Sequence, residues 1–480
     1  MAPDRQAQLE GAGRVYSHAE RMRVVFGILM CLMLAAIDQT VVLPAIPQMA
    51  ASLRGAGQLS WVVSAYLLTA TATTPIYGKL SDQLGRRAVL LPALVFFCAA
   101  SVVCALSSSV LMLILARALQ GIGGGALLAV SQAAVADVIP PRERGKYQAW
   151  FSAVWTVSSV AGPIAGGFVA QHLSWRWIFW FNVPLALLAL GLGARGLAGL
   201  KPVGLRSRID YFGALLMMAA VAVALFGLSA GGVDVPWLSA EEVGVFVLAG
   251  GIFAVLALQQ RRAAAPLFPA ALLARPAFRG VLEISFANAA SMFGAIFLLP
   301  LMLQWLYHQG ASASGLELVP FLFGTTAGAY AAGQVTRHTG RSRVVLVAGV
   351  APSAAAFLLL AVAPGGGTLL YPIGVSAVFG LGIGCVMPTS LVLAQSQAAG
   401  RDMGAATGLL LLVRAMGGAF GATLVGALLA LTHPNLHLGF RYGFCACALL
   451  QLVATVISWR MEEVPLRGAV ESKPAEEAEA

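Results

Sequence analysis

The sequence predicts an all-α polytopic membrane protein, with two bundles of six helices and two further helices inserted between them. Composition is the first observation behind this prediction. Hydrophobic residues make up 59% of the 480 residues, charged residues make up only 10%, and the mean hydropathy is +0.84. A soluble domain of this composition would expose apolar surface on every side, so the chain is expected to lie in a bilayer.

Long apolar runs are the second observation, because a helix needs roughly 20 apolar residues to cross a bilayer core. Backbone groups in lipid must bond within the segment, and these runs are much longer than barrel strands, so we expect helices. The sequence contains fourteen such runs, at about 22–46, 60–80, 87–107, 109–132, 147–171, 177–198, 211–229, 242–259, 280–304, 313–335, 343–363, 368–395, 403–430 and 438–459.

The distribution of positive charge is the third observation. An even number of spans places both chain ends on one side of the membrane. If that side is the cytoplasm, 25 of the 30 Lys and Arg residues fall in cytoplasmic segments, whereas only Arg54, Arg176 and Arg441 fall in outer segments. This is the positive-inside pattern of membrane proteins. The net charge of +10 therefore reports topology and does not indicate a nucleic acid partner.

The runs divide the chain into five parts. We expect a cytoplasmic tail at 1–21, a six-helix bundle at 22–198, a linker with two inserted transmembrane helices at 199–277, a second six-helix bundle at 278–459 and an acidic cytoplasmic tail at 460–480. The polar N-terminus lacks the features of a cleaved signal peptide, so the first span is expected to act as an uncleaved anchor.

Two similar loops indicate an internal repeat. The loops GKLSDQLGRR at 78–87 and GQVTRHTGRSR at 333–343 each contain two glycines seven positions apart, followed by Arg. Each loop follows the second span of its bundle. Parallel repeats with a substrate site between them are a common plan of transporters, so a transport function is favoured.

The first of these loops is dense in charge and glycine. A solvated loop that obeys the positive-inside rule explains its cations, but it requires neither the carboxylate nor the glycines. The glycines would let neighbouring helices approach closely, and the carboxylate can cap a helix N-terminus, whose partial positive charge favours an anion. We therefore predict a gating motif, formed by Gly78, Lys79, Asp82, Gly85, Arg86 and Arg87.

Two opposite charges are expected at similar depth in the first bundle. A charge at the centre of a membrane helix costs at least ~2.5–3.5 kcal/mol, so such residues are functional candidates. With a rise of ~1.5 Å per residue, Asp38 lies roughly 21 Å and Arg117 roughly 18 Å from the cytoplasmic side of a ~30 Å core. They can pair directly or through water, either as a static link between helices or as a proton relay.

The second bundle offers less decisive polar residues. Glu283 lies four residues after Arg279, so its carboxylate can either reach the cytoplasmic interface or receive a cationic substrate. Arg414 can be its counter-charge or can stabilise the span at about 403–430. The candidate substrate cavity is lined by Glu283, Asn288, Phe293, Gln304 and Arg414.

Small residues predict close helix packing at two places. GIGGGA at 121–126 fits a loose dinucleotide-binding pattern, but no strand precedes it, so helix packing is the better interpretation. In the span at about 147–171, small residues at helical spacing plus a proline indicate a thin, bendable helix. These are Gly162, Pro163, Gly166 and Gly167.

Taken together, several segments resemble the major facilitator superfamily and, more narrowly, its fourteen-spanner drug:proton antiporters. The segments are IDQTVVLPAIP, GKLSDQLGRR, RALQGIGGGA, AGPIAGG, WRWIFWFNVP and TGLLLLVRAMGGAFG. The resemblance implies that the gating motif latches onto the span at about 403–430, that Asp38 and Arg117 couple protons, and that the 162–167 motif lies between the two bundles. One departure is Leu43, where the family often has Asn, next to an unusual Pro44.

The function implied by the resemblance is proton-coupled export of hydrophobic, cationic or zwitterionic small molecules, as in multidrug efflux and antibiotic resistance. The protein is expected to work as a monomer in a bacterial inner membrane. A same-fold exporter of a lipid or endogenous metabolite, and a non-transporting structural or sensory membrane protein, remain as alternatives. The sequence shows no phosphate loop, metal-ligand cluster or Ser/His/Asp set in a soluble domain, so we expect no enzyme, metal or cofactor.

Overall fold

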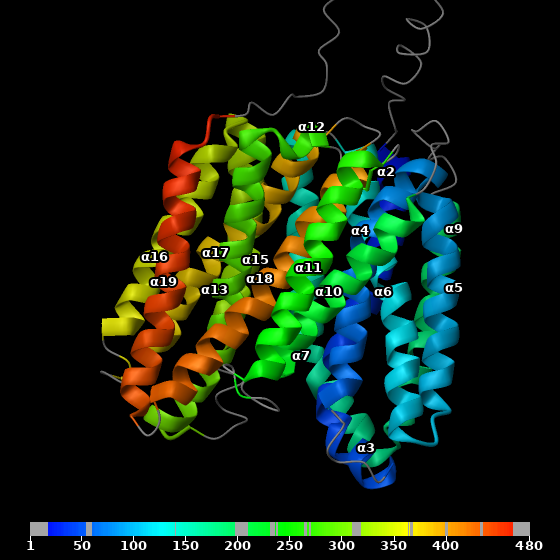
Figure 1. The fold of residues 1–480 in the computed structure, drawn as a ribbon, viewed down its shortest axis with the longest axis horizontal. Helices are drawn as coiled ribbons and strands as arrows, with labels where there is room; N and C mark the ends of the chain where they lie inside the picture. Colours follow the sequence, from blue (N-terminus) through cyan, green and yellow to red (C-terminus); the bar gives the residue numbers. More distant parts are fainter. Residues whose placement is uncertain are drawn as a thin grey trace, which may run out of the picture.

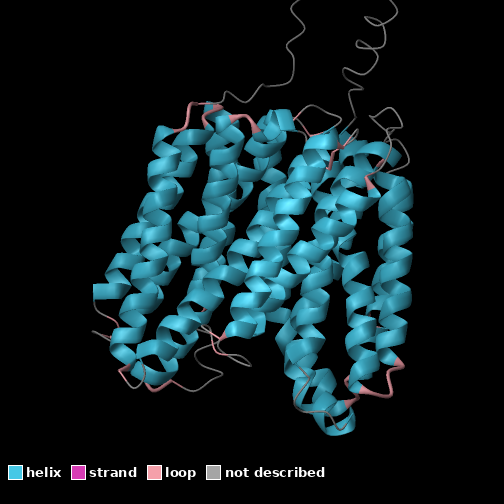
Figure 2. Cartoon of the chain, in the orientation of Figure 1, coloured by secondary structure: helices cyan, strands magenta, loops and turns pink. Residues whose placement is uncertain are grey.

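A computed structural model describes residues 18–53, 60–139, 141–196, 210–230, 236, 239–263, 266–267, 270–309, 318–362, 364, 368–398, 402–432 and 435–463. Every regular element in this part of the chain is a helix (Figure 2). Most of the two predicted tails, the beginning of the predicted linker and Arg54 lie outside the described residues.

The N-terminal half is a group of antiparallel helices on the right of Figure 1. Helices α4 and α5 pack on α6, while α2 packs on α7 and α9. The helices are α2 (His18–Val41), α3 (Ile46–Leu53), α4 (Ser60–Leu84), α5 (Arg86–Ala105), α6 (Val110–Val138), α7 (Pro141–His172), α8 (Arg176–Trp180) and α9 (Asn182–Gly196).

The C-terminal half forms a second group, on the left of Figure 1. Helices α15 and α16 pack on α17, whereas α13 packs on α18 and α19. The helices are α12 (Ala270–Leu273), α13 (Pro276–Leu306), α15 (Val319–Thr339), α16 (Ser342–Val362), α17 (Leu370–Gln397), α18 (Met403–Thr432) and α19 (Leu436–Arg460).

Two helices lie between these groups in the view of Figure 1: α10 (Tyr211–Ala230) and α11 (Ala240–Arg262). Helix α10 packs on α4 and α18, and α11 packs on α10. The two halves also touch directly, because α4 packs on α18 and α7 packs on α15. The insert therefore borders the contact that α4 and α18 make between the halves.

Twelve helical segments among the described residues are long and apolar enough to cross a membrane, so a multi-pass membrane protein is supported. The predicted number of fourteen is not confirmed by this measure, because α4 and α15 are not among the twelve. Both helices are rich in Thr, Gly and Ala, and both face the other half of the protein. Small residues at such interfaces allow close approach of the helices, at the expense of mean hydropathy.

In both repeated loops the second glycine has a positive φ. Gly85, between α4 and α5, has φ 93°, and Gly340, between α15 and α16, has φ 67°. Positive φ is readily adopted only by glycine, which explains the second glycine of each loop. The first span ends earlier than predicted, at Val41, and is followed by a 3₁₀ turn (Leu43–Ala45) that contains Pro44.

Glycines in GIGGGA bring α6 onto α4. A Cβ at Gly121 would overlap the carbonyl oxygen of Tyr66, and a Cβ at Gly125 would lie 2.5 Å from the carbonyl oxygen of Ala70. The motif lies within a continuous helix, which agrees with close helix packing and leaves no loop for a nucleotide phosphate.

We expect Gly121→Ala to destabilise the protein by about 1–3 kcal/mol, because the new methyl group meets backbone that cannot move aside without separating α6 from α4. Gly250→Ala is the matched control, since a Cβ at Gly250 meets nothing within 4 Å. Thermal unfolding of the purified variants in detergent measures the difference. Equal melting temperatures for Gly121→Ala and Gly250→Ala would contradict the close packing of these helices.

Candidate functional site

An ion pair is buried in the N-terminal half. Asp38 on α2 and Arg117 on α6 are each 1% exposed, and the Arg117 Nη1 atom lies 2.6 Å from the Asp38 Oδ2 atom. Of the two arrangements considered from the sequence, the structure has direct pairing. Because a buried pair is tolerated only when its remaining polar atoms are also bonded, the surrounding groups decide its character.

Amide side chains complete the carboxylate shell. Gln120 Nε2 donates to Asp38 Oδ1 at 2.9 Å, and Asn182 Nδ2 donates to the same oxygen at 2.6 Å. Both amides also donate to the hydroxyl of Ser101 on α5. Asp38 thus accepts three hydrogen bonds from the side chains of α6 and α9.

The guanidinium of Arg117 is enclosed by acceptors and aromatic rings. Its Nη1 also donates to Gln120 Oε1 at 2.6 Å, and its Nε donates to the carbonyl oxygen of Val62 on α4 at 3.2 Å. The guanidinium carbon lies 4.3 Å from the ring centroid of Tyr66 and 5.8 Å from that of Phe179. Both contacts are within the range of cation–π attraction, so the cation is compensated without water.

A second cluster of charged residues joins the two halves, at the end of the protein where α2 begins. Asp82, at the end of α4, accepts from the backbone N–H of Gly404 at 2.8 Å and of Ala405 at 3.0 Å. These are among the first residues of α18, where unpaired N–H groups and the helix dipole attract an anion. A carboxylate from one half thereby caps a helix of the other.

Other residues of the gating motif hold Asp82 in place. Arg86 lies 2.7 Å from Asp82 and 2.8 Å from Asp137 at the end of α6, while Lys79 lies 3.2 Å from Asp402. A Cβ at Gly78 would overlap the carbonyl oxygen of Gly404, so glycine is required for this approach. Gly85 supplies the positive φ described above. Arg87 is exposed, which suits a purely topological role.

The residues of the 162–167 motif are divided between two faces of α7. A Cβ at Gly162 would overlap Thr40, and one at Gly166 would overlap the carbonyl oxygen of Val41, so these two glycines pack α7 on α2 within the N-terminal half. The hydroxyls of Thr156 on α7 and Thr326 on α15 lie 2.8 Å apart across the contact between the halves. Pro163 is exposed and follows Thr156 by two helical turns on the same face, so a position of the motif between the halves stays a prediction. Gly167 is half-buried near Pro44.

The predicted cavity residues do not form one group. Asn288 is buried and accepts from Gln451 Nε2 at 3.3 Å, so the prediction that it lines a cavity is wrong: its side chain faces α19. Glu283 is exposed, Phe293 is 44% exposed and packs against Gly418, and Gln304 is half-buried. Arg414 is half-buried and donates to Ser390 Oγ at 2.8 Å and to the carbonyl oxygen of Met387. Among the described residues, no ion pair joins it to Glu283.

Sequence reasoning assigned no role to Gln120, Asn182 or Ser101. Gln120 follows Arg117 by three positions, a spacing that places both side chains on one face of a helix, so this residue had a readable signal. Asn182 belongs to the quoted segment WRWIFWFNVP but carries no spacing relation to Asp38. Its position depends on the packing of α9 against α2 and α5.

Comparison with known proteins assigns the family. The model of the Major Facilitator Superfamily matches residues 28–422 and 284–480, in two overlapping matches that together cover most of the chain. The chain belongs to the Major Facilitator Superfamily. It is therefore a transporter by family and by fold, not an enzyme.

Relatives within this superfamily include exporters. An uncharacterized MFS-type transporter of Mycobacterium tuberculosis is 37% identical over 84% of this chain and 58% of its own length. The multidrug transporter protein MdtP of Bacillus subtilis is 32% identical over 87% of this chain and 77% of its own length. The chain thus spans somewhat over half the length of the mycobacterial relative.

Solved structures of the superfamily share the fold. The human organic anion transporter MFSD10 aligns with a TM-score of 0.67 and 18% identity, covering 91% of this chain and 99% of that chain. The proton:xylose symporter XylE aligns with a TM-score of 0.67 and 15% identity, covering 93% and 97%. At these identities the likeness shows the fold alone.

The titration of Asp82 yields a test of the contact between α4 and α18. Burial raises the pKa of Asp82 to about 6, against the opposing effects of Arg86 and of the N–H groups of Gly404 and Ala405. In a separated state the carboxyl meets water, where its pKa is about 3.9. The joined state, in which α4 and α18 are in contact, therefore binds this proton more tightly than the separated state. Protonation of Asp82 stabilises the joined state as the pH falls through about 6, and this stabilisation is lost at higher pH.

We expect acidification from pH 7.5 to 5.5 to increase the joined population, measured as the distance between spin labels at Leu84 and Arg341, which are exposed on opposite halves. Asp82→Asn cannot titrate and should remove this pH dependence and slow transport. Glu143→Gln is the control, because Glu143 pairs with Arg21 inside the N-terminal half. A pH response that persists in Asp82→Asn would assign the effect to another group.

Proposed function

We propose that the protein is a proton-coupled antiporter that exports hydrophobic, cationic or zwitterionic small molecules by alternating access. The observation that carries the proposal is Asp38, a carboxylate sealed with Arg117 among polar donors in the membrane-embedded half. An antiporter needs a titratable group that responds differently in its two conformations. The name of the relative MdtP, a multidrug transporter protein, supports transport of small molecules.

The geometry supports a coupling sequence that starts from the joined state. Here Asp38 accepts hydrogen bonds from Arg117, Gln120 and Asn182. Desolvation favours the neutral carboxyl, whereas Arg117 favours the carboxylate, so a small displacement of Arg117 changes protonation. Proton uptake from outside would loosen the Arg117 contact and release substrate, and proton release to the inside would restore the ionised state.

The proposal includes fourteen spans, with α4 and α15 crossing the bilayer alongside the twelve apolar helices. In both helices Thr hydroxyls bond within the helix: Thr69, Thr73 and Thr74 of α4 and Thr326 and Thr339 of α15 donate to carbonyl oxygens four residues earlier. Such bonds make low-hydropathy helices compatible with membrane depth. Fourteen spans put both termini on one side, and the positive-inside rule makes that side the cytoplasm of a bacterial inner membrane. We further propose that the monomer is the working unit.

Thiol labelling tests this orientation. Leu84→Cys lies at the end of α4 with a 44% exposed side chain, and Ser108→Cys lies exposed between α5 and α6 at the opposite end. On a background without the six natural cysteines, an impermeant reagent added to intact cells should label position 108 and not 84. Permeabilised cells should be labelled at both. External labelling of position 84 alone would reverse the orientation and the proposed direction of proton flow.

The coupling role is tested with Asp38→Asn, which is nearly isosteric but cannot titrate. We expect export driven by an imposed pH gradient in proteoliposomes to disappear, while downhill exchange of substrate continues. The retained exchange separates lost coupling from lost folding. Glu283→Gln is the comparison, because Glu283 is an acidic residue of another predicted span and is exposed.

Glu283→Gln should keep proton coupling and lose preference for cationic over neutral compounds. Pumping by Asp38→Asn with unchanged proton flux per substrate would make the Asp38–Arg117 pair a static link between helices. Uncoupling by Glu283→Gln alone would move the coupling site to α13. If the protein without substitutions exchanges none of the small hydrophobic compounds tested, the alternative of a lipid or metabolite exporter is favoured.

A further inference from the structure

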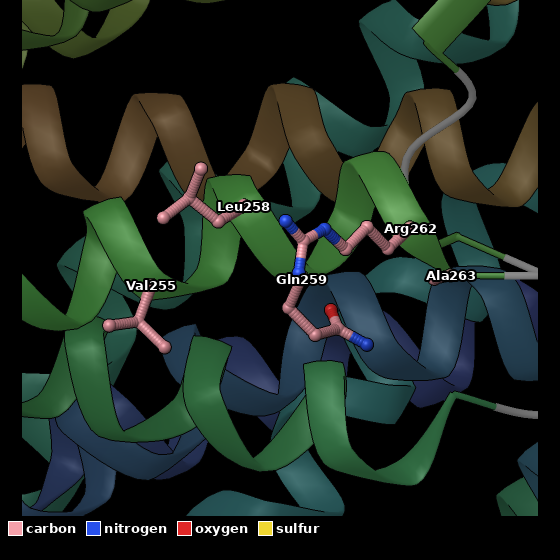
Figure 3. Close-up of a pocket in the computed structure, with 5 residues that line it drawn as sticks. All are labelled: Val255, Leu258, Gln259, Arg262 and Ala263. Atoms are coloured by element: carbon pink, nitrogen blue, oxygen red, sulfur yellow. The ribbon is translucent and has the colours of Figure 1, made fainter.

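Helix α11 is the least covered of the apolar helices. Only 17% of the most apolar 18-residue segment of α11 is buried. Among the described residues, α10 is the one helix that packs on it extensively. Near the end of α11 lies an open pocket of ≈ 370 Å³, lined by Val255, Leu258, Gln259, Arg262 and Ala263. Figure 3 shows the apolar Val255 and Leu258 on one side and the polar heads of Gln259 and Arg262 on the other.

The polar end of the pocket carries an uncompensated positive charge. Gln259 and Gln260 both donate to Asp210, which also accepts from the N–H of Gly213 at 2.8 Å. Asp210 therefore bonds to neutral donors, and among the described residues it forms no ion pair with Arg262. Among the described residues, no ion pair involves Arg262, and the pocket lining contains no acidic residue. An anion is the charge complement of this site.

Neighbouring residues place the pocket at the membrane surface. Tyr211 and Phe212, at the start of α10, are 74% and 60% exposed, and Asp210 ties this end of α10 to the end of α11. Exposed aromatic side chains of this kind gather at the boundary between headgroups and hydrocarbon. Arg262 thus lies at headgroup level, where anionic phospholipids concentrate on the cytoplasmic side.

An apolar track leads from Arg262 into the hydrocarbon. Leu258, Val255 and Gly251 follow at helical spacing on the same face and are all exposed. A Cβ at Gly251 would meet nothing within 4 Å, so the helix surface is open there. From Arg262 to Gly251 the helix rises roughly 16 Å, about half of a ~30 Å hydrocarbon core. The track has the length of one leaflet.

We propose that this pocket binds one anionic phospholipid, with its phosphate on Arg262 and one acyl chain along Leu258, Val255 and Gly251. The site is separate from the proposed transport pathway, so it does not depend on that function. It lies on the insert that packs, through α10, on α4 and α18. A bound lipid would therefore fasten the insert to the bilayer beside the contact between the two halves.

The test is native mass spectrometry of the full chain in detergent, titrated with dioleoyl-phosphatidylglycerol or dioleoyl-phosphatidylcholine. Arg262→Gln should weaken phosphatidylglycerol binding about fivefold, the effect expected of one interfacial cation, and leave phosphatidylcholine binding unchanged. Arg261→Gln is the matched control, because Arg261 is exposed at the same helix end but does not line the pocket. It should change affinity less than about twofold.

Leu258→Trp fills the apolar end and should also weaken phosphatidylglycerol binding, without touching the charge. Equal losses in Arg261→Gln and Arg262→Gln would mean diffuse attraction to the helix end and would overturn the site. Equal affinity of the parent for the two lipids, or competition by glycerol phosphate as strong as by the whole lipid, would do the same. A dimer dispersed by Leu258→Trp, with lipid binding unaltered, would assign this surface to a second copy of the chain.

Discussion

The contact between Asp38 and Arg117 governs the N-terminal half, because two charges sealed from water must have every polar atom bonded or the half is destabilised. Asp38 and Arg117 bring α2 and α6 together, Asn182 adds α9, Ser101 adds α5, and the carbonyl of Val62 adds α4. Five helices thus contribute to one hydrogen-bonded network around the ion pair. A motion that slid any of them would leave a buried charge unbonded, so the half is constrained to move as one body while the ion pair exists.

The contact between the halves, in contrast, can be broken by a single movement. Asp82 holds α18 through two backbone hydrogen bonds at the edge of the bundle, and a rigid rotation of one half breaks both together. Arg86 connects Asp82 to Asp137 at the end of α6, and α6 also carries Arg117, roughly 30 Å away along the helix. Because one continuous helix contributes to both clusters, a tilt of α6 changes the two sites at once. That shared helix gives the proposed coupling a mechanical basis.

The sequence predicted those features whose energetic cost can be read from the order of the residues alone. Apolar length identified the helices, and the cost of burying Asp38 and Arg117 singled them out. It placed Asn288 wrongly because α13 is apolar around most of its circumference, so no periodicity reveals which face meets α19. It could not place Asn182, whose contact with Asp38 depends on the packing of α9. For α4 and α15 the sequence signal is weak for a structural reason: their apolar residues are replaced by small ones where the halves meet.

The charges of the C-terminal half are arranged differently, and this bears on the class of substrate. Phe286 on α13 contacts Gly417 on α18, and Glu283 and Arg414 each lie about one turn before this contact on helices that run in the same direction. The two charges are therefore at one level, yet the hydrogen bonds of Arg414 within the described part of the chain go to neutral acceptors on α17. No ion pair joins Arg414 to Glu283 among the described residues, unlike the pair in the N-terminal half. Within the proposed function, a cation complements Glu283 alone, whereas a zwitterion complements both charges.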